Sequence, residues 1–331
     1  MKKKVLSLLL VVAMAVGMFA GCGNNSGNGE KIKLNVAYMP NYGSLWAITN
    51  AIEQGYLEAE GIEVTLTEFQ DGPTIIAAME SGSIDIGYIG QGAHKLCING
   101  RAKIFALSHI SNGDALIGGP GIKSVKDLAG KKVAYSSGTS SEDILVNSLK
   151  KEGMTMDDIQ AMDMDASAIV TAMLSGGVDA CATWSPNSLK ILEELDGATK
   201  LTDNMTFVDE TVSLASWIVM SGYATDNKET LVKFTRALFK AMDYAATEHQ
   251  DATADLVAKQ TAQDKEAVYN QRGDAEWLTG KAVAAGAADG TVKGYYELQK
   301  QTFVDAGAVE VDPVPEVEDY VLLDVMIEAG K

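Results

Sequence analysis

The sequence predicts an α/β fold of two lobes, each built on a sheet with a parallel core, joined by a hinge of two crossover strands. Strand and helix patterns alternate along residues 32–89, and such an order forms parallel sheets with right-handed crossovers. A related pattern recurs later in the chain. In addition, 331 residues are many for a single hydrophobic core.

The first unit begins with a β-rich run at 32–38 (IKLNVAY), which ends in a Met-Pro-Asn-Tyr-Gly loop. A helix is predicted at 45–60. Residues 62–69 (IEVTLTEF) alternate between apolar and polar side chains, as a strand does when one of its faces is buried. A second helix at 74–81 and a buried strand at 84–89 complete a βαβαβ unit.

The second unit is similar to the first. Residues 168–184 (AIVTAMLSGGVDACATW) align with 74–90 (TIIAAMESGSIDIGYIG), and Ile, Ala, Met, Ser, Gly and Asp coincide. A repeat of about 95 residues is too long for a solenoid and fits two similar α/β lobes. Chance similarity between two helix–turn–strand units is the alternative.

The chain is accordingly divided into a signal peptide at 1–21, a flexible tether at 22–30, a first lobe formed by 31–115 and 222–331, and a second lobe formed by 116–221. We expect the chain to cross between the lobes near 114–121 and to return near 217–224. Residues 225–331 are predicted to be mainly helical and to join the first lobe, since 231–246 repeats its apolar residues with a period of 3.6.

The first residues predict an exported lipoprotein. A positive segment (Lys2, Lys3 and Lys4) precedes an apolar run at 5–19, which is short for a membrane-spanning helix. The run ends in Ala20-Gly21-Cys22, so Cys22 is the predicted site of lipidation. The expected location is extracytoplasmic, anchored by lipid at the outer face of the cytoplasmic membrane or in the periplasm. Phe19 stands where Leu is more usual, and a plain signal peptide is the alternative.

The composition excludes some partners. The chain has 27 basic and 45 acidic residues, for a formal net charge of −18, which argues against nucleic acid and against an anionic membrane surface as direct partners. An anionic ligand would therefore have to be held by local dipoles. Cys97 and Cys181 lie far apart in apolar segments and are predicted to be buried free thiols, with a disulfide as the alternative.

No motif points to catalysis. His94, His109 and His249 lack the spacing of a metal site, and no nucleophile elbow or phosphate loop is present. His94 and His109 are expected in the core or at its rim. The prediction is that the chain is not an enzyme and takes no metal and no cofactor.

Polar loops at strand ends are the predicted ligand site, because ligands of open parallel sheets bind outside the carboxyl ends of the strands. The loop 136–143 (SSGTSSED) leads into a helix, whose free N–H groups and dipole favour an oxyanion. An ordinary N-cap is the alternative there. Trp46 either covers a ligand or packs within the lobe, and Asp114 either pairs with a ligand ammonium or caps a turn. The candidate ligand-binding residues are Asn41, Tyr42, Ser44, Thr74, Gln91, Gly92, Asp114, Gly138, Thr139, Ser140, Ser141, Trp184, Ser185 and Trp217.

Several stretches resemble the solute-binding proteins of ABC transporters in the nitrate/sulfonate/taurine class, and most of all the taurine-binding branch. They are VAYMPNYGSLW, LEAEGIEVTLTEFQDGPTIIAAMESGSIDIGYIG, SVKDLAGKKVAYSSGTSSEDILVNSLKKEGM and MLSGGVDACATWSP. The resemblance implies a periplasmic-binding-protein type II fold, closure of the lobes on a small ligand, and delivery to ABC permease subunits that work with a cytoplasmic ATPase. A monomer is expected.

The resemblance also assigns roles. The loop from Gly138 to Ser141 and Thr74 match positions that hold the anionic head of the ligand, and Asp114 falls where the taurine branch places an acid for the amine. Before Trp217 that branch carries another acid, whereas this chain has Leu214-Ala215-Ser216. A small sulfonate or taurine-like ligand is predicted. The alternatives are nitrate, bicarbonate, an amino acid, a pyrimidine precursor or an aromatic acid, and an enzyme on the same fold.

Overall fold

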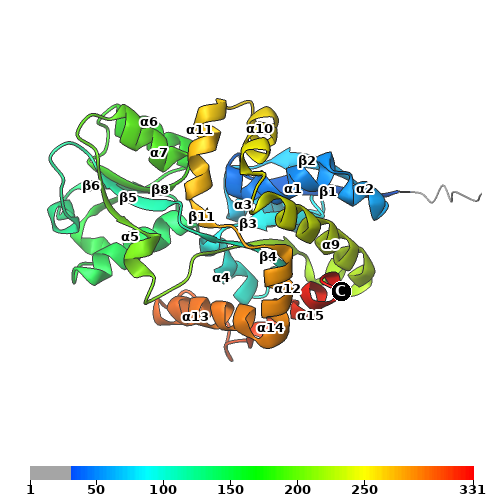
Figure 1. Cartoon of the computed structure of the whole chain (residues 1–331). Helices are drawn as coiled ribbons and strands as arrows, with labels where there is room; N and C mark the ends of the chain where they lie inside the picture. Colours follow the sequence, from blue (N-terminus) through cyan, green and yellow to red (C-terminus); the bar gives the residue numbers. More distant parts are fainter. Residues whose placement is uncertain (1–30) are drawn as a thin grey trace, which may run out of the picture. The chain divides into compact units, whose positions relative to one another are not determined.

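The computed structural model describes residues 31–331 (Figure 1). The predicted signal peptide 1–21, the tether 22–30 and Cys22 therefore lie outside the described residues. Within 31–331, no helix combines the length and the apolar character that a membrane crossing requires. The described chain forms two mixed sheets covered by helices, which confirms the predicted α/β class.

The first sheet has six strands in the order β11-β4-β10-β3-β1-β2. Strands β1, β2 and β3 are parallel to one another, as predicted, and β10 runs antiparallel to both β3 and β4. The strands are β1 (Ile32–Tyr38), β2 (Ile62–Glu68), β3 (Ile86–Ile89), β4 (Lys103–Ser111), β10 (Leu214–Val219) and β11 (Ala275–Glu276).

The second sheet has five strands in the order β7-β6-β8-β5-β9. Its parallel core of β7, β6 and β8 is followed by the antiparallel strand β5, just as β2, β1 and β3 are followed by β10 in the first sheet. The two sheets therefore share one strand order, which is the structural counterpart of the sequence repeat. The strands are β5 (Asp114–Gly118), β6 (Lys132–Tyr135), β7 (Gln160–Asp163), β8 (Ala180–Trp184) and β9 (Thr199–Asp203).

The helices of the first lobe come from both ends of the described chain. The single helix predicted at 45–60 is two helices, because Gly55 adopts a left-handed conformation (φ 70°) and ends the first of them. The helix predicted at 231–246 is confirmed as α9, which packs on α1. The elements are α1 (Tyr42–Glu53), α2 (Tyr56–Ala59), α3 (Gly72–Glu80), η1 (Gln91–Ala93), α4 (His94–Ile98), α8 (Ser221–Asp226), α9 (Lys228–Ala245), α10 (Gln250–Thr261), α11 (Lys265–Asn270), η5 (Gln271–Gly273), α12 (Gly280–Asp289), α13 (Thr291–Asp305), α14 (Val317–Tyr320) and α15 (Leu323–Ala329).

The second sheet is buried on both faces. Along β5, Leu116 joins one apolar cluster, while its neighbours Ala115 and Ile117 join another, because successive side chains of a strand point to opposite faces. Helix α5 contributes to the first cluster, and α6 and α7 contribute to the second. The helical elements of this lobe are η2 (Val125–Leu128), α5 (Ser140–Lys151), η3 (Met156–Asp158), α6 (Ala166–Leu174), α7 (Asn187–Glu194) and η4 (Asn204–Phe207).

The chain crosses between the sheets twice. The first crossing joins β4 to β5 at 111–114, near the predicted place. The second lies before β10, and therefore earlier than the predicted return near 217–224, because β10 pairs with β3 and β4 along its whole length. The two crossings meet, since the backbone N–H of Ser111 donates to the carbonyl of Ser213 at 2.7 Å. The limits given for the lobes (31–115 with 222–331, and 116–221) remain a prediction.

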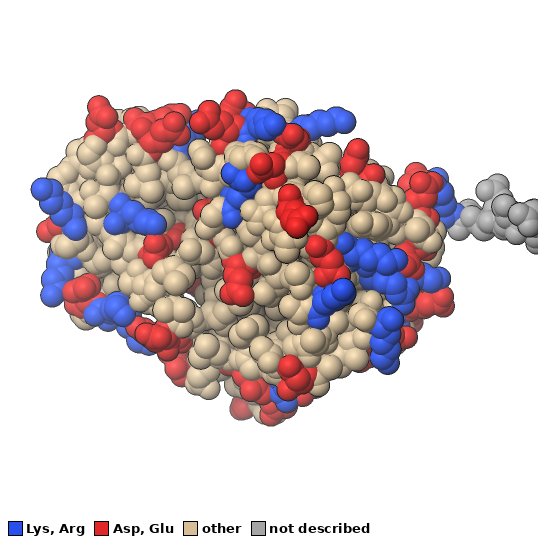
Figure 2. Space-filling model, in the orientation of Figure 1, with Lys and Arg blue, Asp and Glu red and all other residues tan. Residues whose placement is uncertain are grey.

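Cys97 and Cys181 are buried and free, as predicted, and burial raises the pKa of both thiols. Figure 2 shows Lys and Arg side chains interspersed with Asp and Glu over the face that it draws. Many of these exposed charges form ion pairs, such as Lys31 with Glu58 and Arg101 with Glu80. Exposed pairs contribute little to stability, so the apolar clusters hold the lobes together.

The lobes touch where η1 meets the start of α5. A Cβ atom added to Gly92 would lie 2.1 Å from the carbonyl carbon of Thr139 and 2.5 Å from the amide nitrogen of Ser140. Both atoms belong to the backbone and cannot rotate away. Position 92 thus admits no side chain while the lobes keep this contact.

We predict that Gly92→Ala lowers the free energy of unfolding by about 1–3 kcal/mol, the usual cost of overpacking. Gly90→Ala is the matched control, because a Cβ atom there meets nothing within 4 Å. Urea unfolding of both variants is the measurement. Equal stability of the two would contradict the contact.

Candidate functional site

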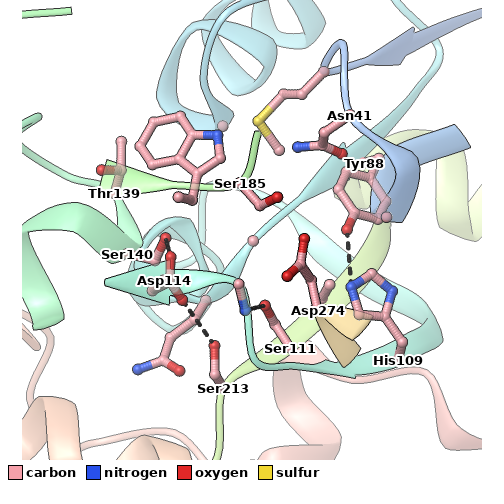
Figure 3. A pocket seen from close by; sticks show the side chains of 18 of the residues that line it. Asn41, Tyr88, His109, Ser111, Asp114, Thr139, Ser140, Ser185, Ser213 and Asp274 are labelled. Atoms are coloured by element: carbon pink, nitrogen blue, oxygen red, sulfur yellow. Dashed lines mark hydrogen bonds between the residues drawn. The ribbon is translucent and has the colours of Figure 1, made fainter. Parts of the chain in front are cut away.

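A cavity lies between the two sheets and encloses about 690 Å³ of empty space, part of it open to solvent. Its walls come from both lobes. The first lobe contributes the loop before α1, the turn η1 and residues around η5 and β11. The second contributes the start of β5, the N-terminus of α5 and the end of β8 (Figure 3).

Half of the candidate residues line this cavity and half do not. None of their predicted roles in binding is tested by the geometry alone. The lining residues among them are Asn41, Gln91, Asp114, Thr139, Ser140, Trp184 and Ser185. Those that lie elsewhere are Tyr42, Ser44, Thr74, Gly92, Gly138, Ser141 and Trp217.

Ser44 and Ser141 hold the two loops together. The Ser44 hydroxyl accepts a hydrogen bond from the amide of Met39 at 2.9 Å, and the Ser141 hydroxyl accepts one from the amide of Ser136 at 3.0 Å. Both side chains are fully buried, and each bond spans five residues. The two serines therefore have the same structural role in the two lobes.

The aromatic candidates of the first lobe are core residues. Tyr42 is buried, and its ring lies edge-on to Trp277 with centroids 4.9 Å apart. Trp217 is fully buried against Tyr88 and Phe234. Trp46 is also fully buried, and its indole N–H donates to Ser108 at 3.0 Å, which favours the packing alternative for this residue.

The N-terminus of α5 is already occupied by an acid of the chain. The amide of Gly138 donates to Glu142 at 2.9 Å, and Lys95 of the first lobe pairs with the same carboxylate at 2.9 Å. Thr139 caps α5, while its hydroxyl donates to the Ser136 carbonyl. This terminus therefore offers an anionic ligand less than the sequence indicated. At the other helix, the amide of Thr74 donates to Asp71.

Asp114 lies buried at the start of β5, where three segments meet. Its carboxylate accepts hydrogen bonds from Ser140, from Asn204 at 2.9 Å and from Ser213 at 3.4 Å. Burial raises the pKa of Asp114, and the three hydrogen bonds act in the opposite direction. The Asp114 side chain is therefore anchored by the protein and also lines the cavity.

Asp274 faces the same cavity and was missed in the sequence. Its pKa is raised to about 6, chiefly by burial and in part by the charge of Asp114, while Ser185 and Lys200 act in the opposite direction. Its Oδ2 atom and the Ser185 hydroxyl are buried and form no hydrogen bond within the described part of the chain. Figure 3 shows both groups at the cavity. The only signal for Asp274 was the short QRGDAEW stretch, which interrupts a helical region and also supplies Trp277.

Aromatic rings form much of the remaining wall, namely those of Tyr88, His109, Trp184 and Trp277. Burial lowers the pKa of His109 to about 3, so this imidazole is neutral at pH 7. It lies 3.4 Å from the Tyr88 hydroxyl and 3.1 Å from the Ser108 hydroxyl. His109 thus lies at the rim, as expected, and adds no positive charge.

The cavity is negative. Asp71, Asp114 and Asp274 line it, and none of its lining residues within 31–331 is Lys or Arg. The same described residues contain no group of three or more His, Cys, Asp and Glu side chains that could hold a metal ion. The buried carboxyl of Asp114 and the partly buried carboxyl of Asp274, with no basic residue in the cavity lining, favour a ligand that brings its own positive charge.

Comparisons with known proteins agree with the fold. Residues 44–253 match the protein family described as NMT1/THI5 like. A protein of Brucella abortus named as a binding protein is 31% identical over 297 residues, which cover 89% of this chain and 92% of that protein. A protein of Bacillus subtilis named for the binding of aliphatic sulfonates is 28% identical over 274 residues, which cover 79% of this chain and 80% of that protein.

Among solved structures, the periplasmic aliphatic sulphonate binding protein of Escherichia coli superposes with a TM-score of 0.65 at 22% identity. The match covers 89% of this chain and 99% of that one. The similarities confirm the two-lobed fold and the predicted resemblance to sulfonate-binding proteins.

We predict that Asp274→Asn stabilises the ligand-free protein at pH 7 by about 1–2 kcal/mol, since a shift of two pKa units in a partly exposed group has this order of effect. Because its folded-state pKa is raised from 3.8 to about 6, Asp274 should make the free energy of unfolding fall as the pH rises from about 4 to about 6 and level off above that.

Chemical unfolding at a series of pH values would show this slope in the native chain and a flatter curve in the variant. Asp157→Asn is the control, because Asp157 is exposed on η3. Identical pH dependence of the native chain and Asp274→Asn would contradict the assignment.

Proposed function

This chain belongs to the NMT1/THI5-like family, and we propose that it is the extracytoplasmic solute-binding subunit of an ABC importer. Its ligand is a small molecule with a protonated nitrogen, of the taurine-like kind, held in the cavity between the lobes. The observation that supports the ligand class is the pair of carboxyls, the buried Asp114 and the partly buried Asp274, in a cavity whose lining holds no Lys or Arg.

The protonated nitrogen follows from charge balance. A bare anion in this cavity would face Asp114 and Asp274 with no basic side chain among the lining residues, and an unpaired buried charge is costly. A cationic nitrogen reverses the sign of both interactions. Asp274 also supplies the second acid that the sequence lacks before Trp217, although it comes from a distant part of the chain.

A sulfonate group on the same ligand would rely on neutral donors. The amide nitrogen of Asn41 and the Ser185 hydroxyl line the cavity, and the Asn41 oxygen is used to cap α1 by accepting from Ser44. Trp184 and Trp277 supply flat apolar surface for a short carbon chain. Relatives named for aliphatic sulfonates support this ligand class. Nitrate, bicarbonate and aromatic acids fit a negative cavity less well.

Binding is proposed in preference to catalysis. The carboxylate of Asp114 is engaged by three hydrogen bonds, and His109 is neutral and held between two hydroxyls. The curated relatives named for ligand binding support the same choice. Closure would occur about the two crossings at Ser111 and Ser213, driven by ligand contacts with both lobes. The closed protein, a monomer, would then deliver its ligand to permease subunits that work with a cytoplasmic ATPase.

The first test is a thermal-shift and calorimetric panel on the purified protein. Taurine should bind and ethanesulfonate, which lacks the nitrogen, should bind far more weakly. Asp274→Asn should lower the affinity for taurine by about 10- to 100-fold, because a hydrogen bond to a charged group contributes about 1.5–3 kcal/mol. Asp157→Asn serves again as the control. Equal affinity for taurine and ethanesulfonate would rule out recognition through the nitrogen.

The proposed lipid anchor is tested separately in cells. The native chain should incorporate a labelled fatty acid and fractionate with membranes, whereas Cys22→Ser should lose the label and be released or retained as an unprocessed precursor. Unchanged labelling of Cys22→Ser would refute lipidation at this residue. Ligand binding by the purified protein should not change in this variant.

A further inference from the structure

A second, smaller cavity, the rear cavity, lies beside Asp114 and contains about 300 Å³ of empty space, part of it open to solvent. It shares four lining residues with the ligand cavity, so these residues form a common wall: Gln91, Asp114, Ser140 and Ser213. The residues that line only the rear cavity are Asp143, Ile144, Asn147, Asn204, Phe207 and Thr211. Of these six, only Asp143 lies in a stretch that the sequence had indicated, the loop 136–143.

Two buried acceptors in this rear cavity have no partner. The Oε1 atom of Gln91 and the Oδ2 atom of Asp143 are buried and form no hydrogen bond within residues 31–331. Gln91 is only 5% exposed and lies in the wall between the two cavities. Buried polar groups are rarely left unpaired, so both acceptors point to a donor that is supplied from outside the chain.

The charges around Asp143 show what that donor should carry. Burial raises the pKa of Asp143 to about 7, and the nearby carboxylates of Glu142 and Asp114 also raise it. Lys95 acts in the opposite direction, as does the Gln91 amide. However, Lys95 is already paired with Glu142 at 2.9 Å. The rear cavity therefore combines two acids with no free cation in its lining.

We propose that the rear cavity is a subsite for part of a cationic group with several N–H-bearing nitrogens, so that preferred ligands reach past Asp114 toward Asp143. This inference rests on the proposed function, because another nitrogen of the same group would lie between Asp114 and Asp274. A guanidinium group has the required chemistry. Its planar fork of N–H donors matches carboxylates, and its flat face can stack on Phe207.

Calorimetry at pH 7 with taurine and with its guanidino analogue, 2-guanidinoethanesulfonate, tests the subsite. The guanidino ligand should bind at least about tenfold more tightly, the order expected for an additional charge-assisted hydrogen bond. It should also release about half a proton, because a cation beside a carboxyl that is half protonated at pH 7 favours the ionised form. Titrations in two buffers of different ionisation enthalpy measure this release.

Asp143→Asn should remove both the tenfold preference and the proton release, while the affinity for taurine stays within about twofold. Asn147→Leu, which changes only the rear cavity, is a second variant that should also reduce the preference. Asp157→Asn is the matched acid-to-amide control, and thermal unfolding verifies that each variant is folded.

The same chemistry has a second possible source, a free ammonium ion. If ammonium chloride, but not sodium chloride, stabilises the native protein and not Asp143→Asn, the subsite is supported with a separate cation as its occupant. Equal affinity for the two sulfonates with no proton release, and no effect of ammonium, would overturn the subsite while leaving taurine binding intact. Failure of both sulfonates and of ammonium to bind would overturn the subsite and the proposed function together.

Discussion

The buried carboxylate of Asp114 joins the parts of the molecule on which the rest depends. It begins β5 just after the first crossing, and it accepts hydrogen bonds from α5, from η4 and from Ser213, which lies just before β10 at the second crossing. The backbone bond between Ser111 and Ser213 ties the same two crossings directly. One side chain thus contacts both crossings and faces the cavity, so the candidate ligand site lies beside the connections between the lobes.

Each sheet is completed by a strand that arrives from the other lobe, β5 in the second sheet and β10 in the first. This exchange explains which parts of the fold could be predicted. The parallel core follows from local periodicity, which the sequence displays openly in IKLNVAY and IEVTLTEF. The place of β10 is set by long-range pairing with β3 and β4, and no local pattern contains that information. The break in the first helix likewise depends on a single left-handed glycine, Gly55.

The candidate site, like the fold, could be predicted only in part from the sequence. Strand ends predicted the cavity region, because the carboxyl edges of parallel strands converge whatever the loops contain. Side-chain direction could not be predicted, and Ser44 and Ser141 turn inward to brace their loops. Asp274 was not predicted, because it lies in a mainly helical segment far from Asp114 in the sequence. Only the pairing of β11 with β4 brings it near Asp114.

The two thiols give the protein a practical property. Cys97 and Cys181 are buried, and burial raises the pKa of both, which makes them slow to react with electrophiles at neutral pH. With Cys22 replaced by serine, a single cysteine introduced on the cavity rim would be the preferred site for a maleimide dye. The chain is therefore suited to conversion into a reagentless fluorescent biosensor, in which the dye reports ligand uptake without removal of any native cysteine from the core.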